Sequence, residues 1–156
     1  MTAPTHYRVP DSRMEAAMNA LIRRLADRGL GPAGAQSLTV VGRVSGTPQR
    51  TPVNPTEVDG RRYLVSPRGN TQWSRNLRVA GTAELGTGRR AQTVRAVEIA
   101  DAEKVAVLRP YLVRWGWEVG RFLPAGPDGA AVDKNSADEV LAFVAPSIPI
   151  FEIHSV

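Results

Sequence analysis

The residues best suited to chemistry lie between Gly42 and Val53, a stretch that reads GRVSGTPQRTPV. It follows an apolar run and contains two glycines, which permit backbone conformations that other residues resist. Its arginines, Arg43 and Arg50, carry planar guanidinium groups that match the geometry of carboxylate and phosphate. Because hydroxyl side chains lie between them, the stretch predicts an anion-binding turn between two strands.

A second basic segment runs from Ser66 to Arg78 and reads SPRGNTQWSRNLR. Arg68 lies at the end of an expected strand, and Trp73 and Asn76 fall on the expected helix that follows. A basic loop that leads into a helix favours anions through free N–H groups and the helix dipole. Neither segment matches a Walker loop or a dinucleotide fingerprint, and composition alone also fits two solvated turns.

Cysteine and histidine are too scarce for several kinds of site. The chain has no cysteine, so it has no disulfide, thiolate nucleophile or cysteine-bound metal. Its two histidines, His6 and His154, lie at opposite ends of the sequence, which argues against a histidine triad or metal site. We therefore expect no metal. The sequence shows neither a bilayer-spanning apolar run nor a signal-peptide pattern, so we expect a cytoplasmic protein.

The positive charge comes almost entirely from arginine, and the formal net charge is +5. This bias fits high-GC coding, or an acidic partner such as nucleic acid, a membrane surface or a polyanionic small molecule. The arginines cluster in two turns and one helix, without an exposed aromatic ladder. The pattern therefore argues against nucleic acid as the partner.

The central part of the chain predicts short strands joined by turns. The dipeptide Asp59-Gly60 between two of them is a strong two-residue hairpin signal. The expected strands cover residues 37–42, 50–58, 61–66, 82–86, 91–100 and 148–153. Six strands with few, separated helices predict an α+β protein with an antiparallel sheet closed into a small barrel.

The N-terminal part predicts a flexible arm over residues 1–11 and then an amphipathic helix. Ser12 and Glu15 match a capping box, and apolar residues follow at spacings of three and four until about Gly29. We expect this helix to pack on a single domain over residues 12–156. Its basic amphipathic pattern also fits peripheral membrane contact.

Three further helices are predicted. A short one is capped by Asn70 or Thr71, and a long one has Asp101 as its N-cap. Pro110 is expected to kink or divide the long helix. A last short helix begins at a capping box from Ser136 and ends at about Val144.

The two basic segments together resemble the deazaflavin-dependent nitroreductase family. Residues 38–53 are similar to its loop pattern GR[KR]SGxxRxTP, and Trp73-x-x-Asn76-Leu77 is similar to its W-x-x-N-L step. The resemblance is good from about Ser37 to Glu98 and loose in the tail. It implies a split β-barrel fold related to flavin-mononucleotide oxidoreductases.

The same resemblance implies that the anion is coenzyme F420, an 8-hydroxy-5-deazaflavin with a phosphate and a glutamate tail; flavin mononucleotide (FMN) is the alternative. The first loop would hold the phosphate and tail, and the strand after it would lie beside the ring. The second loop would pass along the ring and the phosphate, and the helix after it would shape the far wall. The implied cofactor-binding residues are Arg43, Val44, Ser45, Gly46, Arg50, Thr51, Pro52, Val65, Ser66, Pro67, Arg68, Trp73 and Asn76.

Two positions depart from the family pattern. Val44 and Gln49 stand where many members carry basic residues. Each missing charge-assisted contact is worth roughly 1.5–3 kcal/mol. Tail binding is therefore expected to weaken or to shift toward Arg68 and Arg78.

The implied reaction is hydride transfer from the reduced coenzyme to a quinone, an enone or a nitroaromatic compound. Tyr111 and Trp115 are expected to form an acceptor-binding wall, with Tyr111 as the catalytic proton or hydrogen-bond donor; plain core packing is the alternative for both. Helical spacing places Trp117 on another face. A split-barrel protein that binds the coenzyme without turnover is the rival function, and pairing into a homodimer is a further expectation.

Overall fold

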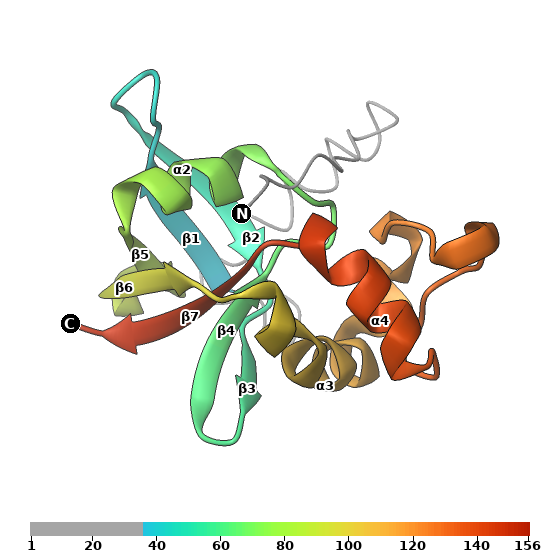
Figure 1. Cartoon of the computed structure of the whole chain (residues 1–156). Coiled ribbons are helices and arrows are strands. Elements are labelled where there is room, and N and C mark those ends of the chain that lie inside the picture. The colour runs from blue at the N-terminus through green and yellow to red at the C-terminus, as the bar shows by residue number, and fades with distance from the viewer. Residues whose placement is uncertain (1–35) are drawn as a thin grey trace. The chain divides into compact units, whose positions relative to one another are not determined.

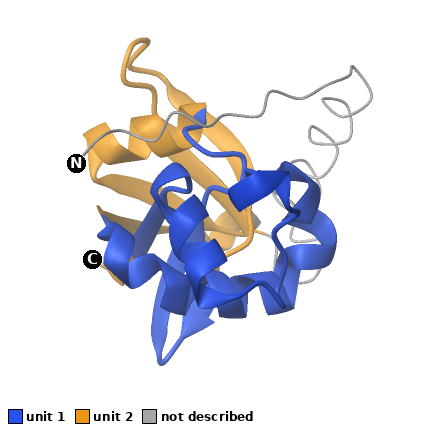
Figure 2. Ribbon diagram, turned by 45° about the vertical axis from the view of Figure 1, so that its right-hand side comes forward, with its two compact units in different colours: residues 1–8, 56–71, 98–152 blue, residues 9–55, 72–97, 153–156 orange. Residues whose placement is uncertain are grey.

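The computed structural model describes residues 36–156, which fall into two compact units (Figure 2). Unit 1 contains residues 56–71 and 98–152, and unit 2 contains residues 36–55, 72–97 and 153–156. The expected arm, the helix that begins at Ser12 and its membrane contact lie outside the described residues. The expectation of a single domain stays a prediction.

Unit 2 is an antiparallel arrangement of strands with one helix on it. Its elements are β1 (Gln36–Val41), β2 (Pro48–Val53), α2 (Gln72–Ala80), β5 (Thr82–Gly86), the 3-10 helix η1 (Gly88–Arg90) and most of β6 (Gln92–Glu98). The strand order is β2-β1-β5-β6, and α2 lies across β1 and β5 (Figure 1). Alternate residues of these strands are buried, as in Leu38 and Val40 of β1, and α2 buries Leu77. The alternation leaves the other side chains of each strand outside this core.

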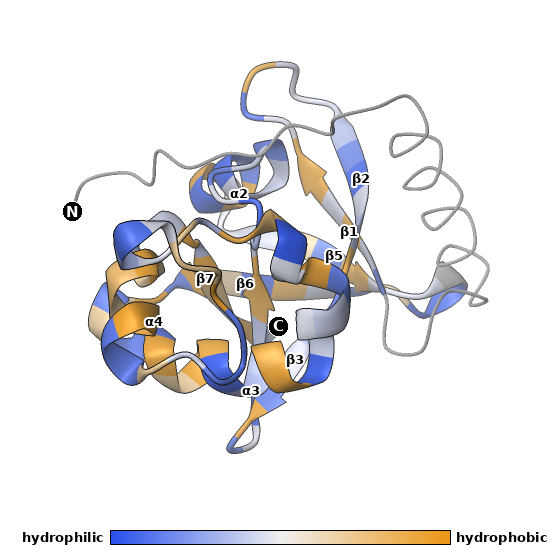
Figure 3. Cartoon of the chain, turned by 90° about the vertical axis from the view of Figure 1, so that its right-hand side faces the viewer, coloured by the Kyte–Doolittle hydropathy of each residue, from blue (hydrophilic) through white to orange (hydrophobic). Residues whose placement is uncertain are grey.

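Unit 1 combines a hairpin with two helices. Its elements are β3 (Thr56–Val58), β4 (Arg61–Val65), α3 (Asp101–Val119), the 3-10 helices η2 (Gly120–Phe122), η3 (Pro127–Gly129) and η4 (Ala145–Ser147), α4 (Asp138–Val144) and the first part of β7 (Ile150–Ser155). α3 and α4 share one apolar cluster with β4, and Figure 3 shows apolar and polar positions interleaved along α4. No helix within residues 36–156 is long and apolar enough to cross a membrane.

The α+β class of the split β-barrel type is confirmed; residues 36–156 contain seven strands where six were expected. The expected strand over residues 50–58 is wrong, because the chain breaks at Asn54-Pro55 into β2 and β3. Proline has no N–H for a strand ladder and restricts the residue before it. The Asp59-Gly60 hairpin is confirmed: both residues have positive φ, 51° and 77°, as a type I′ turn requires.

Three details of the helices differ from expectation. Ala100 is the N-cap of α3, so Asp101 is its first helical residue, and the Ala100 N–H donates to Glu103 Oε2 at 3.3 Å. α3 continues through Pro110, so the helix is not divided there, and a kink at this residue stays a prediction. The N-cap of α4 is Ala137, because the Ser136 hydroxyl instead accepts the N–H of Asp133 at 2.9 Å.

A buried lysine joins the start of α3 to η4, which the sequence did not predict. Lys104 is 1% exposed; its Nζ donates to the Ala145 carbonyl at 3.0 Å and lies 2.9 Å from Asp101 Oδ1. A buried charge is tolerated when it is both paired and hydrogen-bonded. This contact fixes the segment that leads into β7.

The turn after β5 has room for glycine alone. A Cβ on Gly86 would lie 2.6 Å from Ala91 Cα and 2.7 Å from the Arg90 carbonyl oxygen, and both are backbone atoms that cannot turn aside. We predict that Gly86→Ala lowers the free energy of unfolding by about 1–3 kcal/mol. Chemical denaturation measures this. The matched control is Gly116→Ala in α3, where the new Cβ meets only Leu112 Cβ at 3.8 Å; it should be neutral or stabilising by up to about 1 kcal/mol.

Candidate functional site

The turn between β1 and β2 is closed by its own backbone. The Gly42 N–H donates to the Thr47 carbonyl and the Gly46 N–H to the Gly42 carbonyl, both at 2.9 Å. Gly46 has a φ of 70°, in the region that favours glycine. A Cβ on Gly42 would lie 2.6 Å from Ser45 Oγ, so this position must also be small. The two glycines therefore set the shape of the turn.

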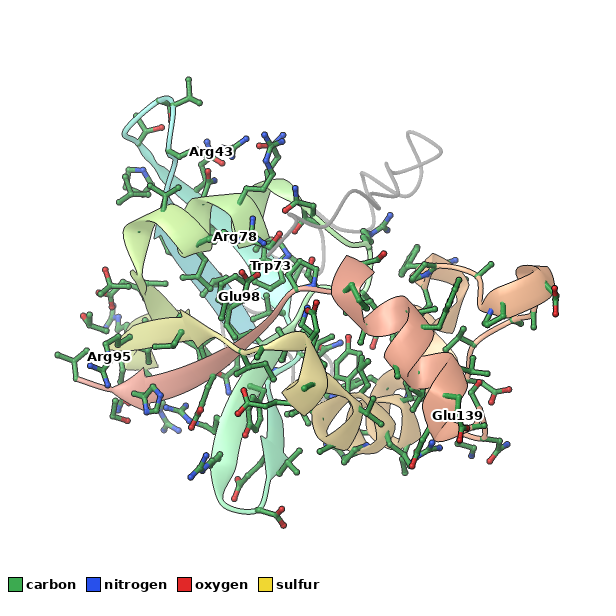
Figure 4. The ribbon with its side chains drawn as sticks, in the orientation of Figure 1. Arg43, Trp73, Arg78, Arg95, Glu98 and Glu139 are labelled. Carbon is green, nitrogen blue, oxygen red and sulfur yellow. The ribbon has the colours of Figure 1, made fainter. Side chains whose placement is uncertain are left out.

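The side chain of Asn76 in α2 holds this turn. Its Oδ1 accepts the backbone N–H of Arg43 at 3.1 Å and the Arg43 Nη1 at 2.7 Å. Its Nδ2 donates to Gln49 Oε1 at 3.2 Å, and Arg43 Nη1 also donates to Gln72 Oε1 at 3.0 Å. Asn76 is 2% exposed, so its own end of these bonds is buried, whereas the Arg43–Gln72 bond is exposed. Figure 4 shows Arg43 beside the turn, and Trp73 and Arg78 on α2.

The hydrogen bonds of Arg43 to Gln72 and Asn76 use only some of its N–H donors. A guanidinium has five N–H donors, and the two on Nη1 of Arg43 are the ones that Gln72 and Asn76 accept. The other three have no partner among residues 36–156, and neither do the backbone N–H groups of Val44 and Ser45. An oriented guanidinium next to backbone N–H groups suits a phosphate or carboxylate. The donor set therefore fits an anionic cofactor.

The remaining predicted residues of unit 2 lie on or near this turn. Val44 is 90% exposed and Arg50 is exposed on β2, where it pairs with Thr39 of β1. Thr51 and Pro52 of β2 and Trp73 of α2 are half-buried. The Ser45 hydroxyl lies 2.9 Å from the Thr47 hydroxyl and accepts the Thr47 N–H at 3.2 Å, so it stabilises the turn itself.

In unit 1, the loop after β4 is folded around Ser66. Ser66 is fully buried; its hydroxyl donates to the Gly69 carbonyl at 2.6 Å and lies 3.0 Å from the Thr71 hydroxyl. Its N–H donates to the Pro149 carbonyl at 2.9 Å. Val65 belongs to the apolar core, and Pro67 is half-buried. Within unit 1, Ser66 and Val65 therefore position the loop, and Arg68 is the charged group that it presents.

Arg68 stacks on a ring that the sequence did not indicate. Its Cζ lies 3.7 Å from the centroid of the Phe122 ring, and the Cζ of Arg121 lies 4.6 Å from the same centroid. Arg121 and Phe122 belong to η2, which directly follows α3. No motif includes these two residues, so only the fold brings them to Arg68.

The predicted acceptor wall lies in the core of unit 1. Tyr111 and Trp115 are 2% and 4% exposed and pack in the apolar cluster, whereas Trp117 is 79% exposed, on another face as expected. Burial, and then the charge of Glu118, raise the pKa of the Tyr111 phenol, so its proton is held tightly. The packing favours the core alternative for Tyr111. The buried Trp115 Nε1–H has no partner among residues 36–156.

We predict that Asn76→Ala loosens the β1–β2 turn and lowers the free energy of unfolding by about 1–3 kcal/mol, because the bonds of this buried amide to Arg43 and Gln49 are lost. Amide hydrogen exchange at Arg43 should become faster. The control is Arg75→Ala on the exposed side of α2, which should stay within about 0.5 kcal/mol of the natural protein. Unchanged exchange at Arg43 in Asn76→Ala would show that the turn does not depend on this amide.

Comparison with solved structures supports the fold. The protein Atu2129, of unknown function, from Agrobacterium tumefaciens shares 16% identity over 99% of this chain and 59% of that chain, with a TM-score of 0.51. The chain thus spans about three fifths of that protein. An F420-H2 dependent reductase (FDR-A) shares 16% identity over 78% of this chain and 95% of that chain, with a TM-score of 0.49.

No curated protein matches the chain. The family model described as F420H(2)-dependent quinone reductase, however, matches residues 22–116, which is more than half of the sequence. The matched segment includes the β1–β2 turn, the Ser66 loop and α2. The chain therefore belongs to this family of deazaflavin-dependent quinone reductases.

Proposed function

We propose that this protein is an oxidoreductase that binds coenzyme F420 and transfers a hydride from its reduced form to a quinone. The observation that carries the proposal is the β1–β2 turn, where Asn76 and Gln72 orient Arg43 and leave three guanidinium donors without a partner among residues 36–156. Family membership supports the same cofactor and acceptor class. When bound, the reduced deazaflavin supplies the hydride.

The chain's own residues bind and orient the cofactor in this proposal. Arg43 and the N–H groups of Val44 and Ser45 hold its phosphate or tail, and Arg50 adds a second charge from β2. Thr51, Pro52 and Trp73 would line its ring; Arg78 on α2 stays a further candidate for the tail. In unit 1, the Ser66 loop presents Arg68 to an anionic group. Asn76, Gln49 and Gln72 act by holding Arg43, and none of them needs to touch the cofactor.

The structure gives a role to Gln49 and to Val44, the two residues that depart from the family pattern. Gln49 accepts a hydrogen bond from Asn76, so it takes part in holding the turn. Val44 contributes its backbone N–H, for which its side chain is irrelevant. The proposal therefore keeps the deazaflavin as the cofactor ahead of FMN.

The acceptor needs an electron-poor carbon that accepts hydride. A quinone fits the family. We extend the proposal to enones and nitroaromatic compounds because they are also electron-poor and can accept a hydride. Trp115 is the better candidate for contact with the acceptor, because its buried N–H would gain a partner from an acceptor oxygen. Pairing into a homodimer, cytoplasmic location and membrane contact through the N-terminal helix stay predictions.

We predict that oxidised coenzyme F420 binds the purified protein and that Arg43→Gln weakens binding by about tenfold or more, because a charged contact is lost. Arg50→Ala should weaken it similarly. Titration followed by deazaflavin fluorescence measures this, with FMN in parallel. The control is Arg89→Gln, which changes an exposed arginine of η1. η1 follows the end of β5, and that end of β5 pairs with the start of β1. Equal affinities in Arg43→Gln and Arg89→Gln would reject the role of Arg43.

We also predict turnover of the reduced coenzyme with menaquinone, followed by the change in deazaflavin absorbance. Flavin and deazaflavin binding without oxidation by any quinone, enone or nitroaromatic acceptor would favour the rival function, a protein that holds the coenzyme without using it. Arg43→Gln should raise the KM for the coenzyme, because the interaction it removes is one of binding.

A further inference from the structure

The solvent side of α3 is apolar along almost its whole length. At about 100° per residue, four exposed apolar residues fall within about 60° of one another around the helix axis: Ala102, Ala106, Val113 and Trp117. Val113 is 63% and Trp117 79% exposed, whereas the opposite side of α3 packs in the apolar core of unit 1. A helix with one side in a core normally carries polar residues on the other side. We call these four residues the outer face of α3, and their exposure indicates a surface that a partner covers.

The Trp117 indole is already held in place. Its Nε1–H donates to the Arg114 carbonyl at 3.1 Å, three residues earlier in the same helix. The polar atom of the ring is thus satisfied within α3, and the exposed remainder of the ring is apolar. Because the side chain is oriented in advance, little rotamer freedom is lost when a partner covers the ring.

These contacts favour a protein partner over a lipid surface. A tryptophan at a membrane interface keeps its N–H for the wet side, where water and headgroups accept it. The N–H of Trp117 instead bonds inside its own helix. Glu103, which is exposed beside the outer face, would also be repelled by anionic lipids.

The outer face is complementary in shape to a second copy of itself. Its N-terminal half carries the small Ala102 and Ala106, and its C-terminal half carries the bulkier Val113 and Trp117, at matching distances from the middle of the helix near Pro110. A second α3, antiparallel about a two-fold axis, would place Trp117 on Ala102 of the partner subunit. Val113 would then meet Ala106 of the partner subunit, and each contact would occur twice.

The charges beside the outer face fit the same arrangement. Glu103 and Arg114 are both exposed and lie eleven residues apart, about three helical turns, so they share one edge of the outer face. The two-fold axis keeps that edge beside its own copy and reverses its direction. Glu103 then lies within roughly 3 Å, measured along the helix axis, of Arg114 of the partner subunit. Within residues 36–156, Glu103 uses only Oε2, which accepts the Ala100 N–H, so Oε1 remains for this arginine.

Arg109, near the middle of α3, is held by the segment that leads into α4. Its Nη1 donates to the Lys134 carbonyl at 2.8 Å, and its Nη2 donates to the Ser136 carbonyl and to Asp138 Oδ1, both at 2.7 Å. Its charge is therefore paired within its own chain. The middle of the outer face is left to Pro110.

We propose that the outer face of α3 is a homodimer interface, in which two copies of α3 pack antiparallel about a two-fold axis. Trp117 packs on Ala102 of the partner subunit, and Glu103 pairs with Arg114 of the partner subunit. This gives the expected homodimer a surface in unit 1, and it depends on neither the coenzyme nor the acceptor. Because one helix of each copy forms the contact, we expect dissociation in the micromolar range.

Introduced cysteines test the arrangement directly, because the chain has none of its own. Ala106→Cys combined with Val113→Cys should form interchain disulfides on mild oxidation, since each cysteine faces the other across the axis. Within one chain the two positions lie about 10 Å apart along the helix, too far for a disulfide. Each single variant should cross-link far less, because identical positions are equally far apart in the dimer. Non-reducing gel electrophoresis measures this, and a double variant that cross-links no faster than the single variants would overturn the antiparallel arrangement.

Analytical ultracentrifugation of the full chain from about 1 to 300 µM should show a monomer–dimer equilibrium. Trp117→Ala should weaken association by about tenfold or more, because the ring is the largest group in the contact. The control is Val79→Ala in α2, which also removes an exposed apolar helix residue, at 70% exposure, and should leave association unchanged.

Reversal of the charges tests the predicted pairs. Glu103→Arg and Arg114→Glu should each weaken association by roughly three- to tenfold, because like charges then face each other twice. The double variant Glu103→Arg/Arg114→Glu should recover most of the natural affinity, because the pairs form again with their charges exchanged. Absence of this recovery in a folded double variant would overturn the pairing.

A natural protein that stays monomeric over the whole range would overturn the proposal. A dimer that Trp117→Ala leaves unchanged would do the same, because its interface would lie elsewhere. Binding of the monomer to anionic phospholipid vesicles, lost in Trp117→Ala, would assign the outer face to a lipid surface instead. Thermal unfolding checks the fold of each variant, and the cysteine pair decides the matter if Glu103→Arg is unstable.

Discussion

The most consequential interaction in unit 2 is the buried amide of Asn76. One side chain accepts from the backbone and the guanidinium of Arg43 and donates to Gln49, so it fixes the turn at three points. A buried amide that makes all these bonds is rigid, whereas one that loses a partner is destabilising. The orientation of Arg43, and with it the anion site, depends on this amide together with Gln72, which accepts the other bond from Arg43 Nη1. It also explains why the loop motif and the helix motif occur together: the second supplies the residue that holds the first.

Local signals in the sequence predicted local structure well. The Asp59-Gly60 turn was predictable because two adjacent residues determine its dihedral angles. The break at Asn54-Pro55 could also have been predicted, because proline has no N–H for a strand ladder. It was missed because the residues on both sides of it are typical of strands. The cap of α4 was mispredicted because Ser136 has a nearer partner in the N–H of Asp133. A hydroxyl that can choose between two local backbone groups is ambiguous in sequence.

The sequence predicted which residue types form the candidate site, but it did not predict the role of each residue. Arginine, serine and glycine in one turn indicate an anion, and the family pattern indicates which one. That Asn76 and Ser66 are buried and act inside the protein depends on partners distant in sequence, such as Arg43 and Pro149. Phe122 carries no signal at all, since an aromatic residue after a helix usually packs in the core. Lys104 was missed for the opposite reason, because lysine is rarely expected at 1% exposure.

The ring beneath Arg68 has a consequence for the working conditions of the protein. Arginines are commonly oriented by carboxylates, which are neutralised in acid and screened by salt. An aromatic face does not titrate, and its attraction acts at a contact distance of 3.7 Å, well inside the screening length of physiological salt. Orientation of this guanidinium by Phe122 is therefore insensitive to acidification and changes in ionic strength, conditions under which a surface ion pair in the same place would weaken.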